Sequence, residues 1–133
     1  MADRSPQIRA CVVDDHEPVR DVVVDMLEGF GVHVCGEAGT FEDGVAMIRR
    51  YRPELAVIDN RLPDGSGIDL CRQASADVPG IHLILHTGMI SPLEESLAES
   101  AGVNRIALKS IFTDGLLDAV RQAVDELTPG LRP

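Results

Sequence analysis

The chain has 133 residues, 44% of them hydrophobic, which is enough to bury the core of one domain of ordinary size. Its 22 acidic residues outnumber its 12 basic ones and give a net charge of −10, so we expect it to repel nucleic acid and anionic membranes. No apolar run approaches the length of a membrane span and the first residues carry no signal-peptide pattern, so we expect a cytoplasmic location without membrane contact.

Five short runs rich in aliphatic residues are predicted to be β-strands, at 8–13, 32–37, 55–59, 81–86 and 105–108. The third run is apolar without alternation up to Asp59, which is typical of a strand buried on both faces of a sheet. The sequence Leu62-Pro63-Asp64-Gly65 predicts a turn behind it, before Gly67 and Ile68 open a helix.

Apolar residues at helical spacing follow each of these runs, so five helices are predicted to alternate with the strands. Thr40 is expected to cap the second helix, and Arg52 to end it because proline follows. The stripes expected to face the core are Val19, Val22, Val23, Met26, Leu27 and Phe30; Val45, Met47 and Ile48; Ile68, Cys71 and Ala74; Leu93 and Leu97; and Leu116, Leu117, Val120, Val124 and Leu127.

This alternation predicts one α/β domain, a three-layer sandwich in which helices cover both faces of a parallel sheet. We expect the domain to occupy residues 1–128 and residues 129–133 to form a flexible tail or the start of a linker. Cys11, Cys35 and Cys71 form no Cys-x-x-Cys pair and lie in apolar or amphipathic stretches, so buried reduced thiols are favoured over a metal or redox site.

Polar residues stand where four of the predicted strands end: Asp14 and Asp15, then Asp59, then Thr87, then Lys109. The carboxyl ends of parallel strands meet at one edge of the sheet, where ligands bind in open α/β folds. Taken singly, the first two acids can cap a helix, Asp59 can form a turn, Thr87 can cap or serve a loop, and Lys109 can be a solvated strand end. Their joint occurrence at strand ends favours a common site.

Three carboxylates at one edge favour a divalent cation, and a site with only oxygen donors suits Mg²⁺ or Mn²⁺ rather than Zn²⁺. Asp59 is then a candidate nucleophile for a phosphoryl group, because carboxylates form aspartyl-phosphate intermediates. Thr87 and Lys109, the only lysine of the chain, would supply a hydroxyl and an ammonium to the developing charge. A zinc site at the four histidines is disfavoured, because no two have helical i, i+4 spacing: His82 and His86 are four residues apart but fall on a predicted strand.

Several motifs now make the chain similar, over residues 7–127, to the receiver domains of two-component response regulators. The motifs are Val12-Val13-Asp14-Asp15-His16, Ile58-Asp59, Leu62-Pro63-Asp64-x-x-Gly67, Thr87-Gly88 and Leu108-Lys109. The resemblance implies a doubly wound, flavodoxin-like sheet in strand order 2-1-3-4-5. It also implies Mg²⁺ held by Asp15, Asp59, the backbone carbonyl of Arg61 and, through water, Asp14. A histidine kinase or phosphotransfer protein would phosphorylate Asp59, and Thr87 and Lys109 would bind the phosphoryl group.

The chain departs from the pattern of these domains at two places. Ser110 follows Lys109 where many members have proline, so we expect a trans peptide bond there, since a cis bond without proline costs about 3 kcal/mol. Ile106 stands where many members have an aromatic switch residue, so we expect switching to rest on Thr87 and the loop 88–91, with Ile106 repacking only slightly. Arg61 and Met89 occupy positions tied in the family to the lifetime of the phosphate.

The expected function is therefore a phosphorylation-activated signalling switch that alters a surface read by a partner or used for dimerisation. Only its own phosphorylation and dephosphorylation are expected as chemistry, so it is not an enzyme in the ordinary sense. One alternative is the receiver portion of a DNA-binding transcription regulator whose output domain lies beyond Pro133. Another is a Mg²⁺-dependent phosphatase with an aspartyl-phosphate intermediate, although Asp59-Asn60-Arg61 lacks a second acid two residues on.

Overall fold

The computed structural model describes residues 7–110 and 115–128. Five strands build the main sheet: β1 (Arg9–Val13), β2 (His33–Ala38), β3 (Leu55–Asp59), β6 (His82–Thr87) and β7 (Arg105–Leu108). The helices are α1 (Glu17–Gly29), α2 (Phe41–Tyr51), α3 (Gly67–Asp77), α4 (Pro92–Ser100) and α5 (Gly115–Leu127). Two short strands, β4 (Arg61–Leu62) and β5 (Gly65–Ser66), form a small hairpin where the sequence predicts a turn.

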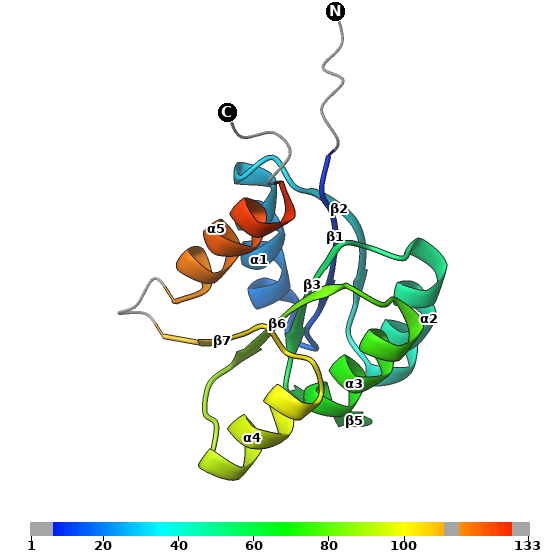
Figure 1. Cartoon of the computed structure of the whole chain (residues 1–133), viewed down its shortest axis with the longest axis vertical. Coiled ribbons are helices and arrows are strands. Elements are labelled where there is room, and N and C mark those ends of the chain that lie inside the picture. The colour runs from blue at the N-terminus through cyan, green and yellow to red at the C-terminus, as the bar shows by residue number, and fades with distance from the viewer. Residues whose placement is uncertain (1–6, 111–114, 129–133) are drawn as a thin grey trace, which may run out of the picture.

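The main sheet is parallel throughout, with the strand order β2-β1-β3-β6-β7. Figure 1 shows α1 and α5 on one face of the sheet and α2, α3 and α4 on the other. The predicted three-layer sandwich is therefore confirmed, and so is the order 2-1-3-4-5 once the small hairpin is left out of the numbering. This order places β3 in the middle of the sheet, with β1 and β6 on either side.

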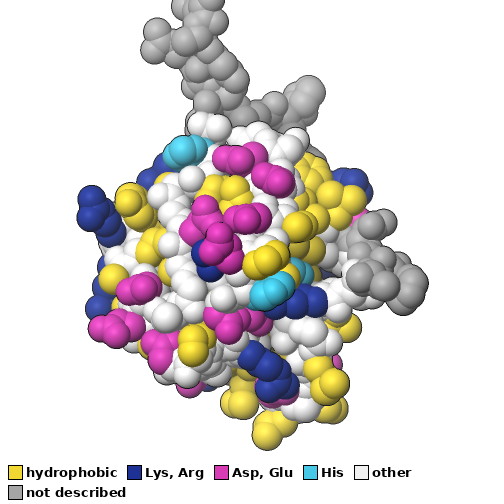
Figure 2. All heavy atoms as spheres, turned by 180° about the vertical axis from the view of Figure 1, so that it is seen from behind, with side chains coloured by type: hydrophobic (Ala, Val, Ile, Leu, Met, Phe, Trp, Pro, Cys, Tyr) yellow, Lys and Arg dark blue, Asp and Glu magenta, His cyan; other side chains and the backbone are white. Residues whose placement is uncertain are grey.

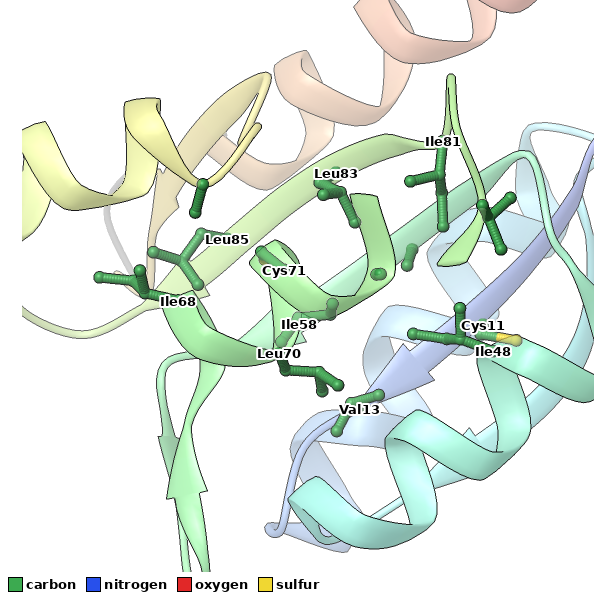
Figure 3. Close-up of a cluster of buried hydrophobic side chains, with 14 of the residues drawn as sticks. Cys11, Val13, Ile48, Ile58, Ile68, Leu70, Cys71, Ile81, Leu83 and Leu85 are labelled. Atoms are coloured by element: carbon green, nitrogen blue, oxygen red, sulfur yellow. The ribbon is translucent and has the colours of Figure 1, made fainter. Parts of the chain in front are cut away.

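The central strand β3 is buried on both faces, as its unbroken apolar sequence predicts. Leu55 and Val57 belong to the core beneath α1 and α5, whereas Ala56 and Ile58 belong to the core beneath α2, α3 and α4. Figure 3 shows the second of these cores, in which Ile58 lies among aliphatic side chains from the neighbouring strands and helices. Asp59, the last residue of β3, is thereby carried to the edge of the sheet on a rigid support.

Helix α3 packs so closely behind β3 that its first residue has to be glycine. A Cβ atom at Gly67 would lie 2.7 Å from the Cα of Asn60 and closer still to the carbonyl oxygen of Asp59. The N–H of Gly67 donates to the carbonyl of Asn60 at 2.8 Å. The loop that carries Asp59 is thus fixed to the start of a helix directly behind it.

The predicted ends of α2 agree with the structure. The side chain of Thr40 accepts a hydrogen bond from the N–H of Asp43 at 3.1 Å and caps the helix. Helix α2 ends at Tyr51, and Arg52 adopts a left-handed conformation with φ of 45°. The Lys109–Ser110 bond is trans, as expected, since no cis peptide occurs among the described residues.

The sequence prediction was wrong for three residues expected in the core, which are exposed in the structure. Leu93 and Leu97 of α4 are 69% and 43% exposed, and Ala98 of that helix is buried instead. Val22 of α1 is 60% exposed, while Val23 and Leu27 are buried. A spacing of three or four residues defines a helix face but does not decide which face turns inward, and α4 approaches the sheet on its small residue.

The cysteines are free, and two of them, Cys11 and Cys71, are buried, whereas Cys35 is partly exposed. Burial raises the pKa of the Cys71 thiol to about 12, as befits an inert core residue. No helix in the described ranges is both long and apolar enough to cross a membrane. The expected tail 129–133 lies outside the described residues.

Candidate functional site

Four strand ends bring the predicted polar residues together at one edge of the sheet. Asp14 directly follows β1, Asp59 and Thr87 end β3 and β6, and Lys109 directly follows β7. One carboxylate oxygen from each of Asp14, Asp15 and Asp59 can be chosen so that all three lie within 4.8 Å of one another. The Nζ atom of Lys109 lies 3.0 Å from Oδ2 of Asp14 and 3.3 Å from Oδ2 of Asp59. Figure 2 shows acidic side chains gathered near the middle of one face of the molecule.

The two inner carboxylates are buried and oriented by the backbone. Asp14 and Asp59 are 2% and 6% exposed, whereas Asp15 is exposed. Oδ1 of Asp59 accepts the N–H of Arg61 at 3.2 Å, and Oδ1 of Asp14 accepts the N–H of His16 at 2.9 Å. Each carboxylate therefore has one oxygen held by its own loop, and its second oxygen faces Lys109.

The surroundings of Asp59 disfavour the ionised form of its carboxyl group. Burial raises the pKa of the Asp59 carboxyl and the neighbouring Asp14 adds to the rise, while the Arg61 N–H and Lys109 oppose it. One ammonium faces two buried carboxylates, with a third close by. The group therefore has an excess of negative charge that a further cation would neutralise.

These aspartates have the donor set of a site for a hard metal ion. Within the described chain, the group of side chains able to hold a metal consists of Asp14, Asp15 and Asp59, all with oxygen donors. No histidine belongs to this group. Carboxylate oxygens at this spacing fit Mg²⁺ and Mn²⁺ better than softer metals.

Thr87 lies at the site, but its hydroxyl has another partner. The residue is fully buried, and its Oγ1 donates a hydrogen bond to the carbonyl of Met89 at 3.1 Å. The N–H of Lys109 donates to the carbonyl of Thr87 at 2.8 Å, which joins the two strand ends. The side chain of Met89 is exposed, and Ile106 is half-buried against the core beneath α2, α3 and α4.

Two neighbours of the site were not foreseen from the sequence. The guanidinium of Arg20, on α1, donates to the carbonyl of Asp14 at 2.7 Å and forms an ion pair with Glu37. His86 lies one residue before Thr87, and burial, helped by the charge of Lys109, lowers its pKa to about 4. Arg20 is brought to the site by the packing of α1 beside β1 and β2, and His86 by its place next to Thr87 on β6.

His82 is a second buried histidine of β6. It is buried, its Nδ1 lies 3.5 Å from Oε2 of Glu126, and its Nε2 has no hydrogen-bond partner among the described residues. Burial lowers its pKa. His82 lies at the amino end of β6, so it is remote from the carboxyl edge that carries Asp59.

An apolar groove of about 650 Å³ opens between α1 and α5, beside Lys109. Its walls include Val19, Val22 and Met26 on one side and Leu116 and Leu117 on the other. The exposure of Val22, which contradicts the sequence prediction, is thus explained by its place in this groove. The acidic site therefore adjoins an apolar surface.

Comparison with known proteins assigns the family. A model of the response regulator receiver domain matches residues 10–121. The chain belongs to this family. It is 36% identical over 117 residues to the DNA-binding transcriptional activator DevR/DosR of Mycobacterium tuberculosis, covering 86% of this chain and 53% of that protein. It is 30% identical over 116 residues to the response regulator protein VraR of Staphylococcus aureus, covering 86% of this chain and 56% of that protein.

A solved structure extends the comparison to three dimensions. The CheY-like response regulator receiver domain protein from Methanospirillum hungatei superposes with a TM-score of 0.84 at 29% identity, covering 94% of this chain and 99% of that one. The receiver domain described here spans about half the length of the curated relatives it matches.

Proposed function

We propose that this receiver domain is a phosphorylation-activated switch whose phosphoacceptor is Asp59. The observation that carries the proposal is the position of the Asp59 carboxylate, which is buried at the end of the central strand, 3.3 Å from Lys109 and beside two further aspartates. Oδ2 of Asp59 would attack the phosphorus of a phosphohistidine. The P–O bond forms as the P–N bond breaks, and the imidazole leaves with its electron pair.

The aspartates would hold the metal ion that such a transfer uses. Asp15 and Asp59 would bind Mg²⁺ directly, Asp14 through water, and Arg61 through its backbone carbonyl; Mn²⁺ can substitute. The ion supplies charge neutralisation for the phosphoryl oxygens. The oxygen donors and the excess of negative charge around Lys109 support this assignment.

Lys109 and Thr87 would bind the transferred group. The ammonium of Lys109 already lies within reach of Asp59, so it can pair with a phosphoryl oxygen after a small movement. The hydroxyl of Thr87 has to leave the carbonyl of Met89 before it can donate to that group. Loop 88–91 then loses the hydrogen bond between Thr87 and the carbonyl of Met89. We expect Ile106 to repack only slightly, because its side chain is already half-buried.

We assign the tuning of the phosphate lifetime to Met89 and Arg61. The N–H of Arg61 holds Asp59, and the exposed Met89 side chain follows Thr87 by two residues in the loop that binds its hydroxyl. A long apolar side chain that folds over the phosphorylated site would slow the attack of water on the acyl phosphate.

The partner that supplies the phosphoryl group would be a histidine kinase or a phosphotransfer protein. The apolar groove beside Lys109 supports a protein donor, because it offers a surface that a helix can cover. A second copy of the chain is a further possible partner, with which the domain would form a homodimer. The name of DevR/DosR describes a DNA-binding activator, so we propose that residues 1–128 act as the receiver portion of such a regulator, with 129–133 as tail or linker.

A phosphatase with the same intermediate is disfavoured by the loop after Asp59. Such an enzyme needs an acid two residues on, where this chain has Arg61. Asn60 is engaged by two hydrogen bonds and offers no carboxyl group. The domain would therefore catalyse only its own phosphorylation and dephosphorylation.

The proposal is tested by incubating the chain with Mg²⁺ and a small phosphodonor such as phosphoramidate, and by counting phosphoryl groups by mass spectrometry. We expect one group on the native chain and none on Asp59→Ala or after chelation of the metal. Asp118→Asn, which removes an exposed carboxylate from α5, is the matched control and should be labelled like the native chain. Labelling of Asp59→Ala, or no labelling of the native chain, would overturn the proposal.

A further inference from the structure

The residue directly after the phosphoacceptor makes contacts that the proposed chemistry does not use. Asn60 is 5% exposed, and its side chain bonds to two different helices. Its Oδ1 accepts the N–H of Ile68 in the first turn of α3 at 3.2 Å, and its Nδ2 donates to Oε2 of Glu94 in the first turn of α4 at 3.0 Å. Asn60 therefore spans the distance between the two helices that flank the site.

Glu94 has a second commitment, to the cap of its own helix. Its Oε1 accepts the N–H of Ser91 at 3.0 Å, and Oγ of Ser91 accepts the N–H of Glu94 at 3.1 Å, which together form a capping box. Hydrogen bonds from Ser91 and Asn60, with the charge of Arg61, lower the pKa of Glu94. One carboxylate thus joins the phosphoacceptor loop to the point where α4 begins.

These contacts close a ring around the loop that has to move. The loop begins at Thr87, whose hydroxyl bonds to Met89, and it ends at Ser91, which is capped by Glu94. Across the ring, Asn60 connects Glu94 to the backbone beside Asp59. Displacement of the loop after Asp59 or of the first turn of α4 strains the hydrogen bond between Asn60 and Glu94. Movement of one of these segments is therefore coupled to movement of the other.

Apart from the charge of Arg61, which also acts on Glu94, other contacts do not provide this coupling. Ile106 replaces the aromatic residue that the family resemblance would lead one to expect, and its side chain has no hydrogen-bonding group. The buried contact of α4 is made by Ala98, in its last turn, away from its first turn at Pro92. Among the hydrogen bonds of the described chain, the one between Asn60 and Glu94 is the one that ties residues 59–66 to α4.

We propose that Asn60 is a positioning residue that transmits the state of Asp59 to the first turn of α4. The inference rests on the proposed function, since it takes phosphorylation of Asp59 as its input. The output is a displacement of the capped end of α4, which carries the exposed Leu93 on its outer side. A partner that contacts this turn would then distinguish the two states of the domain.

The test uses backbone NMR of the native chain and its variants with Mg²⁺ and beryllofluoride, an analogue of the phosphoryl group. Asn60→Asp places two carboxylates against each other, and Asn60→Leu removes both hydrogen-bonding groups of the side chain, so we expect each single variant to lose the shift changes in residues 92–96. The double variant Asn60→Asp/Glu94→Gln restores one donor and one acceptor with the direction of the bond reversed, so it should recover those shifts. Glu95→Gln, on the same turn but exposed, should behave like the native chain.

The readout separates this inference from the proposed function. Shift changes at Asp14 and Thr87 report binding at Asp59, and we expect them in the native chain and in every variant. If they are absent from the native chain, the proposed function fails. If they are present and the α4 shifts survive in both single variants, or stay lost in the double variant, the role of Asn60 is overturned. Thermal unfolding of each variant checks that a loss of response does not come from a loss of fold.

Discussion

Acidification is expected to destabilise this domain through His86, by an amount that the structure defines. His86 is 8% exposed, and its Nδ1 has no hydrogen-bond partner among the residues described. Burial, with a further contribution from Lys109, lowers its pKa from 6.5 to about 4. The unfolded chain therefore takes up a proton below about pH 6.5, whereas the folded chain takes it up only near pH 4.

The sign follows from linkage between protonation and folding. The stability that depends on a neutral His86 is complete above pH 6.5 and is lost as the pH falls from 6.5 towards 4. A pKa of about 4 in place of 6.5 corresponds, at about 1.4 kcal/mol per pKa unit, to a loss of up to about 3 kcal/mol. This is a large part of the stability of an ordinary domain.

The assay is urea unfolding of the native chain and of His86→Phe at pH 7 and pH 4.5. The aromatic ring cannot titrate, and the adjoining groove leaves room for it. Between the two pH values we expect the native chain to lose about 2 kcal/mol more than the variant. The matched control is His33→Phe, which replaces an exposed imidazole on β2. An equal loss in the native chain and in His86→Phe would refute the reasoning.

Three further predictions concern the site and its support. Lys109→Gln removes the ammonium beside Asp59 and should slow labelling by a small phosphodonor by about 10²-fold, as for the loss of other charge-stabilising donors; an unchanged rate would remove Lys109 from the chemistry. Met89→Ala should shorten the life of the acyl phosphate, followed by the decay of labelled protein, whereas Leu93→Ala, an equally exposed control, should not. Gly67→Ala should destabilise the fold by about 3 kcal/mol in urea unfolding, because its Cβ would lie 2.7 Å from the backbone of Asn60. Gly29→Ala, whose Cβ would meet no other part of the chain within 4 Å, should cost less than about 1 kcal/mol. Equal costs would contradict the packing argument.

The sequence predicted those features that depend on local pattern. An unbroken apolar run ending in an acid identified β3 and placed Asp59 at the edge of the sheet. The order of polar residues at strand ends then predicted which side chains meet, since parallel strands bring their carboxyl ends together. Thr40 was found as a cap because its partner lies three residues away.

Features that depend on contacts between distant elements were missed. Leu93 and Leu97 share a helix face with the right spacing, yet that face is exposed because α4 packs through Ala98. The bond from Asn60 to Glu94 joins residues 34 positions apart. No periodicity records such a contact, and neither residue type is unusual in a loop or in the first turn of a helix.

The chain itself supplies a counter-ion for the acidic site, the ammonium of Lys109. Lys109 reaches both Asp14 and Asp59 from the end of the edge strand β7, so the chain can fold with these acids side by side before any dissolved ion arrives. Its ammonium holds the two carboxylates in place by pairing with both of them. If the proposed Mg²⁺ binds these aspartates, we expect Lys109 to be free to turn towards a phosphoryl group. We therefore expect the metal ion to bind before the phosphoryl group.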